Sequence, residues 1–325
     1  MAKAIRVHTT GGPECLVYES FDPRQPASGE VRIIHDAVGL NFIDVYHRTG
    51  QYPIADSPFI PGLEAAGTVA ELGEGVKDFA VGDRVAYAGV PIGAYCDERV
   101  IPAHRLIKIP HGISSETGAA MMLQGMTVQY LIRRTYHVKA GDTVVFHAAA
   151  GGVGLIACQW LNHLGATVIG TVGSEEKAEL AKQHGCHHTV LYREENLVDK
   201  VREITDGNMV PVVYDSVGKD TYTSSLDCLA PMGMLVSFGA ASGPVEAVSP
   251  KDLAAKGSLF FTRPSLMNYT AKREDLVETA TDLIKLVESG VINIKIYQRY
   301  ELKDAAQAHR DLEARKTTGS TIFTV

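Results

Sequence analysis

The sequence lacks the features that mark several classes of protein. Its five cysteines are scattered and odd in number, and no Cys-x-x-Cys pair occurs. This distribution predicts reduced thiols in a reducing compartment, with neither a disulfide framework nor a thiolate zinc site. No apolar run reaches the roughly 18 residues that a membrane span needs, and the amino end is too short and too charged for a secretory signal. We therefore expect a cytoplasmic protein without a membrane segment.

Clustered positive charge is also missing. The formal net charge is -7, and no run of Lys or Arg resembles a nucleic-acid footprint. Polyanion binding is therefore disfavoured, and a small organic substrate is expected. What is present is ordinary for a folded globular protein: 325 residues, 45% hydrophobic and 21% charged. This length favours two domains and leaves one large α/β domain as the alternative.

The pattern of elements changes along the chain. Up to about residue 120, Gly and Pro separate short β-branched runs such as 31–34 and 84–87, which predicts a mainly β domain. Strands at 142–148 and 166–172 then alternate with helices at 154–164 and 175–183, which predicts a parallel sheet covered on both faces. Further strands are expected at 189–191, 211–215, 234–238, 259–261 and 320–325, with helices at 273–289 and 301–315.

A glycine-rich turn, Ala-Ala-Ala-Gly-Gly-Val-Gly, occupies 148–154, between an expected strand and an expected helix. This order presents backbone amides and the positive end of a helix to a pyrophosphate. Gly151 and Gly152 allow the backbone to approach the phosphates, and Gly154 allows the helix to pack closely on the strand. Ala149 replaces the first glycine of the usual fingerprint. The βαβ setting nevertheless favours a dinucleotide site over a purely structural turn.

The end of the next strand distinguishes NAD from NADP. An NAD site offers Asp or Glu about 20 residues after the turn, where this chain has Val172, Gly173 and Ser174, followed by Lys177. Without the carboxylate, a 2′-phosphate meets no repulsion. Gly173 and Ser174 give it room and donors, and Lys177 gives it positive charge. The sequence therefore predicts NADPH, with a solvated helix position as the alternative for Lys177.

Taken together, these motifs resemble the medium-chain dehydrogenase/reductase superfamily, and within it the zinc-free NADPH:quinone reductases related to zeta-crystallin. The resemblance starts at Gly-Gly-Pro-Glu (11–14) and extends to the carboxyl end. It includes Gly-Leu-Asn-Phe-Ile-Asp-Val-Tyr (39–46), Pro-Gly-Leu-Glu-Ala-Ala-Gly (61–67), Gly-Asp-Arg-Val (82–85), the glycine turn and Tyr-Asp-Ser-Val-Gly (214–218). It implies a GroES-like β-rich catalytic domain (1–123 and 266–325), a Rossmann NADPH-binding domain (124–265) with a doubly wound parallel sheet, an active cleft between them, and a homodimer. The run at 259–261 fits an edge strand that pairs across such a dimer, and fits a buried internal strand nearly as well.

The resemblance also places residues where related alcohol dehydrogenases hold catalytic zinc. The matching positions are Asn41, Leu63 and Gln124, none of which is a good zinc ligand, and the four-cysteine structural zinc loop is missing. We therefore expect no metal. Simple alcohols and aldehydes need a Lewis acid to stabilise the developing alkoxide, so the acceptor should be intrinsically electrophilic.

The resemblance implies hydrogen-bond donors to the acceptor at Asn41, Tyr46, Tyr52 and Arg263. The expected cofactor contacts are Asn41, Thr127, Ala150, Gly151, Gly152, Val153, Gly173, Ser174, Lys177, Tyr192, Ser216, Phe238, Gly239 and Ala240. Plainer roles remain open: a turn residue for Asn41, rim aromatics for Tyr46 and Tyr52, an ordinary exposed aromatic for Tyr192, and a structural ion pair for Arg263.

The sequence thus predicts hydride transfer from NADPH to a quinone. The nearest alternative is reduction of an α,β-unsaturated ketone or aldehyde. An alternative of another class, suggested by the zeta-crystallin relatives, is AU-rich RNA binding or a structural crystallin-like role, against which the acidic balance weighs.

Overall fold

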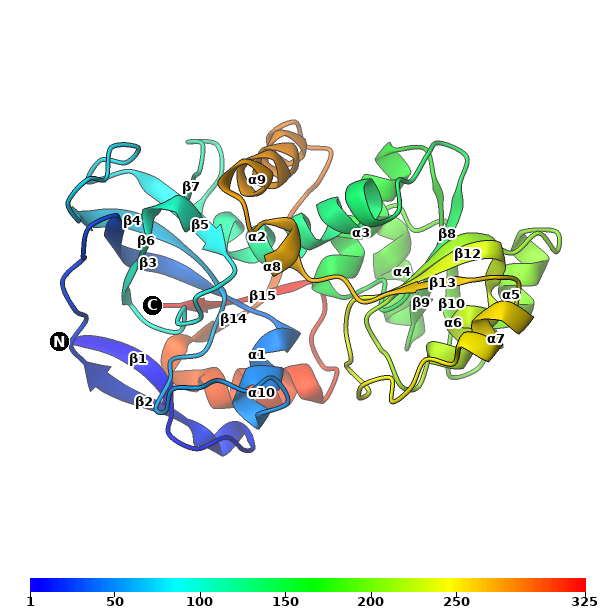
Figure 1. The fold of residues 1–325 in the computed structure, drawn as a ribbon, viewed down its shortest axis with the longest axis horizontal. Helices are drawn as coiled ribbons and strands as arrows, with labels where there is room; N and C mark the ends of the chain where they lie inside the picture. The colour runs from blue at the N-terminus through cyan, green and yellow to red at the C-terminus, as the bar shows by residue number, and fades with distance from the viewer. The chain divides into compact units, whose positions relative to one another are not determined.

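The computed structural model describes residues 1–325, which divide into two compact units. Unit 1 comprises Met1–Met126, Tyr269–Gly290 and Ile294–Val325, and unit 2 comprises Thr127–Asn268 and Val291–Asn293. Both chain ends lie in unit 1 (Figure 1). The chain passes from unit 1 to unit 2 within α2 (Ser115–Tyr130), returns within α8 (Leu266–Tyr269), and enters unit 2 once more for Val291–Asn293. No helix combines the length and the apolarity that crossing a bilayer requires.

Unit 1 is built on β-sheet. A seven-stranded sheet has the order β14-β15-β3-β4-β5-β7 with β6 paired to β3, and β1 and β2 form a separate antiparallel pair. The strands are β1 (Ala2–Val7), β2 (Leu16–Phe21), β3 (Glu30–Leu40), β4 (Glu64–Leu72), β5 (Arg84–Ala88), β6 (Glu98–Pro102), β7 (Ile107–Lys108), β14 (Ile296–Glu301) and β15 (Ser320–Thr324). The remaining helices of unit 1 are α1 (Phe42–Thr49), α9 (Arg273–Glu288) and α10 (Ala305–Glu313). The mainly β character predicted for the first part of the chain is confirmed.

The core of unit 1 follows from strand alternation. Val31 and Ile33, two residues apart on β3, are completely buried, and so is Phe323 on β15. The helix predicted at 301–315 is too long at both ends, since α10 covers Ala305–Glu313. Ile296–Glu301 alternates half-buried and exposed residues and pairs with β15, so it forms a strand, and α10 begins only at Ala305.

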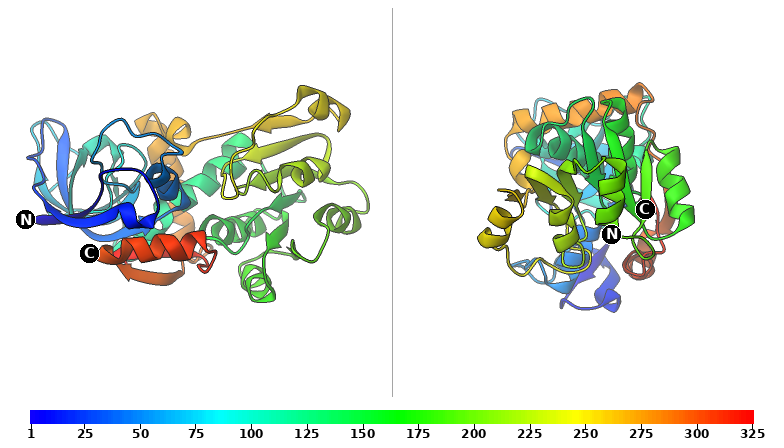
Figure 2. Two further views of the ribbon diagram at one scale, coloured as in Figure 1. Left: turned by 90° about the horizontal axis from the view of Figure 1, so that it is seen from below. Right: turned by 90° about the vertical axis from the view of Figure 1, so that its right-hand side faces the viewer.

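Unit 2 contains six parallel strands in the order β10-β9-β8-β11-β12-β13, with helices packed around them in Figure 2. The strands are β8 (Thr143–Phe146), β9 (Thr167–Val172), β10 (His188–Leu191), β11 (Val210–Asp215), β12 (Leu229–Ser237) and β13 (Phe260–Thr262). The helices are α3 (Gly152–His163), α4 (Glu175–Gln183), α5 (Leu197–Ile204), α6 (Tyr222–Asp227) and α7 (Pro250–Ala255). The predicted α/β fold with a parallel, Rossmann-like sheet is confirmed, whereas α5, α6 and α7 were not expected from the sequence.

The run at 259–261 is resolved by its place in the sheet. Strand β13 is the last strand on one side, and Phe260 is 56% exposed. The prediction of a buried internal strand is therefore wrong, and the edge position is confirmed, whereas pairing of this edge across a dimer stays a prediction.

Candidate functional site

In unit 2, the predicted cofactor residues gather at one edge of the sheet. All six strands are parallel, so their carboxyl ends meet on the same side, and the strand order reverses between β8 and β11. Open α/β sheets bind ligands at such a switch point. Each strand is followed by predicted residues: the glycine turn after β8, Gly173 to Lys177 after β9, Tyr192 after β10, Ser216 after β11, Phe238 to Ala240 after β12 and Arg263 after β13.

The turn after β8 has the geometry of a phosphate cradle. Gly151 is the N-cap of α3, which begins at Gly152, two residues earlier than predicted, so the positive end of the helix lies at the turn. A Cβ on Gly154 would lie 2.3 Å from the Ala148 carbonyl oxygen, a contact that no side chain can make. The bare backbone of this turn therefore fits a dinucleotide pyrophosphate.

The ends of β9 and β10 bring together the residues expected at the 2′-phosphate. A Cβ on Gly173 would lie 3.0 Å from the Tyr192 hydroxyl, so these two residues are neighbours. Ser174 caps α4 and accepts a hydrogen bond from the Lys177 amide at 3.4 Å. This corner combines a helix N-terminus, a hydroxyl, a phenol and an ammonium group, and it contains no carboxylate at position 173 or 174.

The loops after β11 and β12 are held by hydrogen bonds. The buried Asp215 carboxylate accepts from the amides of Val217, at 2.7 Å, and Gly218, at 3.0 Å, which fixes the backbone beside Ser216. Arg263 donates from Nη1 to the Ser237 carbonyl at 3.0 Å, immediately before the predicted Phe238 to Ala240 segment. Thr127 lies on α2 and is buried.

Unit 1 holds the remaining candidates, Asn41, Tyr46 and Tyr52. Asn41 is the N-cap of α1, and it forms a reciprocal capping box with Asp44, whose Oδ2 accepts from the Asn41 amide at 2.9 Å. Tyr46 lies on this helix, and its ring centroid is 5.1 Å from that of Tyr52. The side-chain amide of Asn41 and the phenol groups of Tyr46 and Tyr52 therefore belong to one short segment, which comprises the N-cap of α1, the helix itself and the residues directly after it.

The positions that correspond to zinc ligands hold a hydrogen-bonded chain of amides. Asn41 donates from Nδ2 to Glu64 Oε2 at 2.6 Å, and Gln124 donates from Nε2 to Asn41 Oδ1 at 3.1 Å. Ser320 completes the chain by donating to Gln124 Oε1 at 2.9 Å. Leu63, the third position, is an apolar side chain. Two amides that are already paired and one leucine do not fit zinc, and no group of three or more His, Cys, Asp or Glu side chains comes together elsewhere.

Two acidic groups at this place were not singled out from the sequence. Glu64 is completely buried, and burial raises its pKa to about 8, although Asn41 and the Leu123 amide, which donates to Oε1 at 2.7 Å, lower it. Burial likewise raises the pKa of Asp44 to about 7. Glu64 and Asp44 stood within the quoted motifs at 61–67 and 39–46, but nothing in those motifs shows that the two carboxyls are buried.

Asp44 continues into a second buried network. Its Oδ2 also accepts from the Tyr95 hydroxyl at 2.9 Å, and Tyr95 contacts His309 Nε2 at 3.1 Å. Arg48, which is 1% exposed, lies 3.4 Å from His309 Nδ1 and forms a bidentate ion pair with Glu313, at 2.8 Å for each bond. Helix α1 is thereby fastened to α10, 261 residues further along the chain.

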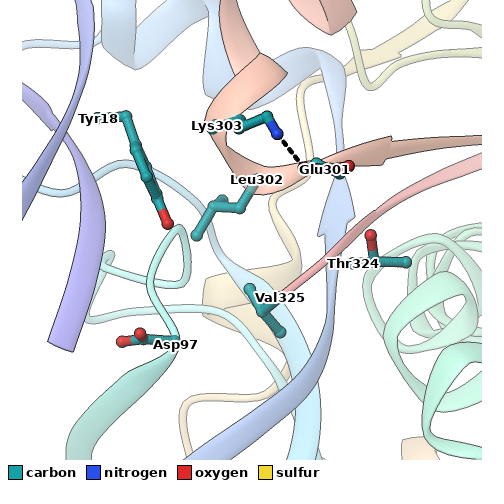
Figure 3. A pocket seen from close by; sticks show the side chains of 7 residues that line it. All are labelled: Tyr18, Asp97, Glu301, Leu302, Lys303, Thr324 and Val325. Carbon is teal, nitrogen blue, oxygen red and sulfur yellow. Dashed lines mark ion pairs between the residues drawn. The ribbon is translucent and has the colours of Figure 1, made fainter.

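A pocket of about 340 Å³ lies elsewhere in unit 1. It is lined by Tyr18, Asp97, Glu301, Leu302, Lys303, Thr324 and Val325, and Lys303 pairs with Glu301 across it (Figure 3). No predicted site residue lines this pocket.

The fold and the site together define a class of protein: a dinucleotide-dependent oxidoreductase with a β-rich unit and a Rossmann-like unit. Two family models match the chain, the alcohol dehydrogenase GroES-like domain at residues 27–111 and the zinc-binding dehydrogenase domain at residues 152–285. A quinone oxidoreductase of Pseudomonas aeruginosa is 53% identical over 323 residues, which is 99% of each chain. A 2-haloacrylate reductase of a Burkholderia species is 46% identical, again over 99% of each chain. The crystal structure of Escherichia coli quinone oxidoreductase complexed with NADPH is 48% identical, covers 100% of both chains and has a TM-score of 0.98.

The chain belongs to the quinone oxidoreductase family of the medium-chain dehydrogenase/reductase superfamily, as the sequence predicted.

Proposed function

We propose that this protein transfers hydride from NADPH to a quinone, and that unit 2 binds the cofactor while unit 1 contributes the groups that bind the acceptor. One observation carries the proposal. Six parallel strand ends bring together a bare glycine turn and a corner with Ser174 and Lys177 but without the carboxylate of an NAD site. The relatives named for quinone reduction match the entire chain.

The residues of unit 2 bind and orient the cofactor. The turn from Ala148 to Gly154 contacts the pyrophosphate, and Ser174, Lys177 and Tyr192 contact the 2′-phosphate. When bound, NADPH supplies the hydride. Ser216 and the segment from Phe238 to Ala240 follow other strands at the same edge, and they orient the rest of the cofactor, while Arg263, after β13, is the predicted donor to the acceptor from this unit.

The residues of unit 1 stabilise the acceptor. Asn41 uses one Nδ2 hydrogen for Glu64, so its second amide hydrogen is available to an acceptor oxygen. The adjoining rings of Tyr46 and Tyr52 give a flat acceptor an aromatic surface and phenolic donors. In a quinone, the negative charge from hydride transfer spreads over an aromatic oxygen, so hydrogen-bond donors are sufficient and no Lewis acid is needed.

A second candidate reaction is reduction of an activated alkene such as an enone or a haloacrylate. The 46% identity to a 2-haloacrylate reductase over the full chain favours it. Steady-state NADPH oxidation with a panel of quinones and a panel of activated alkenes decides between the two. Faster turnover of the alkenes would displace the quinone, and no turnover of either class would refute reductase activity.

Substitution of Lys177 tests the cofactor assignment. Lys177→Ala removes one charge-assisted hydrogen bond, so we expect NADPH to bind roughly 10- to 150-fold more weakly and NADH to bind unchanged. Lys182→Ala, on the same helix, is the matched control and should change neither. Isothermal titration calorimetry measures both affinities, and an equal loss for NADPH and NADH would refute a 2′-phosphate contact.

We further propose a homodimer that forms through the exposed edge of β13 and a cytoplasmic location. An unpaired edge strand with an exposed Phe260 is a ready template for pairing with a second copy. Phe260→Asp would place like charges on the two copies, and sedimentation equilibrium should then show monomers. The same dimer mass in the variant would exclude this edge.

The five free cysteines suit a reducing compartment, and cell fractionation tests that location.

A further inference from the structure

Four buried polar side chains lie directly behind the glycine-rich turn of unit 2. They are His147, Thr171, Asp215 and Ser225, none of them more than 2% exposed. His147 directly follows β8, and the other three come from β9, β11 and α6, so residues 78 apart in the sequence are in contact. The sequence motif includes the turn but not these four side chains as a group.

The hydrogen bonds among them can run in only one direction. The Asp215 carboxylate accepts from four donors, which are the amides of Val217 and Gly218 and the hydroxyls of Thr221, at 2.7 Å, and Ser225, at 2.8 Å. The single hydroxyl hydrogen of Ser225 is therefore committed to Asp215.

This commitment fixes the tautomer of His147. Because the Ser225 oxygen can only accept from the ring, the 2.9 Å contact to Nε2 makes that nitrogen the protonated one. Nδ1 then has a lone pair and accepts from the Thr171 hydroxyl at 3.0 Å. The Thr171 oxygen in turn accepts from the Ala148 amide at 3.3 Å. A continuous series of bonds thus runs from Asp215 to the first residue of the turn.

Ala148 is the residue of the turn that most needs such support. Its φ of +55° lies in the left-handed region, which costs an L-residue roughly 1–2 kcal/mol. In that conformation its carbonyl oxygen accepts from the Gly151 amide at 2.9 Å. The same oxygen lies so close to Gly154 that it leaves no room for a Cβ there. The Thr171 carbonyl also accepts from the Ala149 amide at 3.1 Å, so one residue of β9 holds two successive amides of the turn.

We propose that Thr171, oriented by His147 and Ser225, is a positioning residue that holds Ala148 in its left-handed conformation and so presets the turn for the pyrophosphate of the dinucleotide. This inference rests on the proposed binding of NADPH to unit 2. A turn that is already ordered loses less conformational freedom when the ligand binds, so preorganisation appears directly as affinity.

Substitution of the Thr171 hydroxyl tests the proposal. Thr171→Val keeps the shape of the side chain and removes the hydroxyl, so the affinity for NADPH should fall roughly 10-fold because the Ala148 amide and His147 Nδ1 lose their partner. Thr171→Ser restores the hydroxyl and should restore the affinity to within about twofold. Thr167→Val, on the same strand, is the matched control and should bind as the wild type does.

Two readouts separate positioning from general damage to unit 2. Adenosine 2′-monophosphate carries the 2′-phosphate but no pyrophosphate, so Thr171→Val should bind it as the wild type does. In the cofactor-free protein, hydrogen exchange of the Ala148 amide should be faster in Thr171→Val than in the wild type. Equal NADPH affinity in the valine variant and the wild type would overturn the proposal. So would a parallel loss of adenosine 2′-monophosphate binding. Failure of the wild type itself to bind NADPH would instead refute the proposed function.

Discussion

Replacing the buried carboxyl of Glu64 should make the protein more stable at alkaline pH. In the folded chain, burial raises the pKa of Glu64 from 4.5 to about 8. Between these two pH values the folded state holds a proton that the unfolded state has released, so the free energy of unfolding falls as the pH rises. Glu64→Gln replaces the carboxyl with a neutral amide of the same shape and removes this dependence.

The introduced amide can be fully satisfied by its neighbours. The side-chain amides of Asn41 and Gln124 rotate by half a turn, so that each donates where it previously accepted. The introduced amide then donates to Asn41, Asn41 donates to Gln124, and Gln124 donates to Ser320. The Ser320 hydroxyl, which no longer donates to Gln124, turns its single hydrogen to the Ala120 carbonyl, from which it lies 3.1 Å. The Leu123 amide keeps its acceptor because the introduced side chain retains one carbonyl oxygen.

The size of the effect follows from the shift in pKa. One pKa unit corresponds to about 1.4 kcal/mol, so the ionised carboxyl costs on the order of 5 kcal/mol above pH 8 and almost nothing near pH 4.5. The stability of Glu64→Gln relative to the wild type should therefore rise by on the order of 1 kcal/mol per pH unit between pH 5 and pH 8.

Urea unfolding followed by circular dichroism at pH 5, 6, 7 and 8 measures this difference. Asp44 titrates in both proteins, and because its charge raises the pKa of Glu64, the measured difference also contains the repulsion between these two carboxyls. Glu288→Gln, which alters an exposed carboxyl on α9, is the control and should follow the wild type at every pH. A difference between Glu64→Gln and the wild type that stays constant from pH 5 to pH 8 would show that Glu64 binds no proton on folding.

Three further substitutions test other parts of the structure. Gly154→Ala brings a Cβ within 2.3 Å of the Ala148 carbonyl, so NADPH binding measured by calorimetry should be lost, and wild-type affinity would mean that the turn is not built as described. Glu313→Ala leaves the buried Arg48 guanidinium without its carboxylate partner, so urea unfolding should show a loss of stability. We expect only about 1–3 kcal/mol because Glu313 is itself partly exposed, and an unchanged midpoint would contradict this. Burial and the charge of Arg48 lower the pKa of His309 to about 3, so the contribution of this imidazole to stability should fall as the pH falls below about 6.5, by up to about 1.4 kcal/mol per unit, and it shows in the difference between the wild type and a variant without it. His309→Gln should lose less, and identical acid curves would refute a neutral buried imidazole.

Features that depend on neighbours in the sequence could be predicted from the sequence alone. The strand, turn and helix around Gly151 follow one another directly, so the glycines of the turn predict the phosphate cradle locally. The absence of a carboxylate at Gly173 and Ser174 is equally local, and it indicates the preferred cofactor. The helix predicted at 175–183 coincides with α4, where the Ser174 cap revealed by the structure marks the amino end.

Features that depend on contacts between distant residues required the tertiary structure. Short helices such as the six-residue α6 carry too few turns for a clear period, so nothing in the sequence indicates that Ser225 contacts His147. Burial is likewise a property of the assembled fold: Glu64 looks like any surface glutamate until β3, β4 and α2 enclose it, and its pKa rises only because they do. The sequence by itself determined the class of fold, the glycine-rich turn proposed to bind the pyrophosphate, and the residues at the zinc positions. Only the tertiary structure decided which buried side chains hold Asn41 and Ala148 in place, because those hydrogen bonds join elements that the chain brings together from far apart.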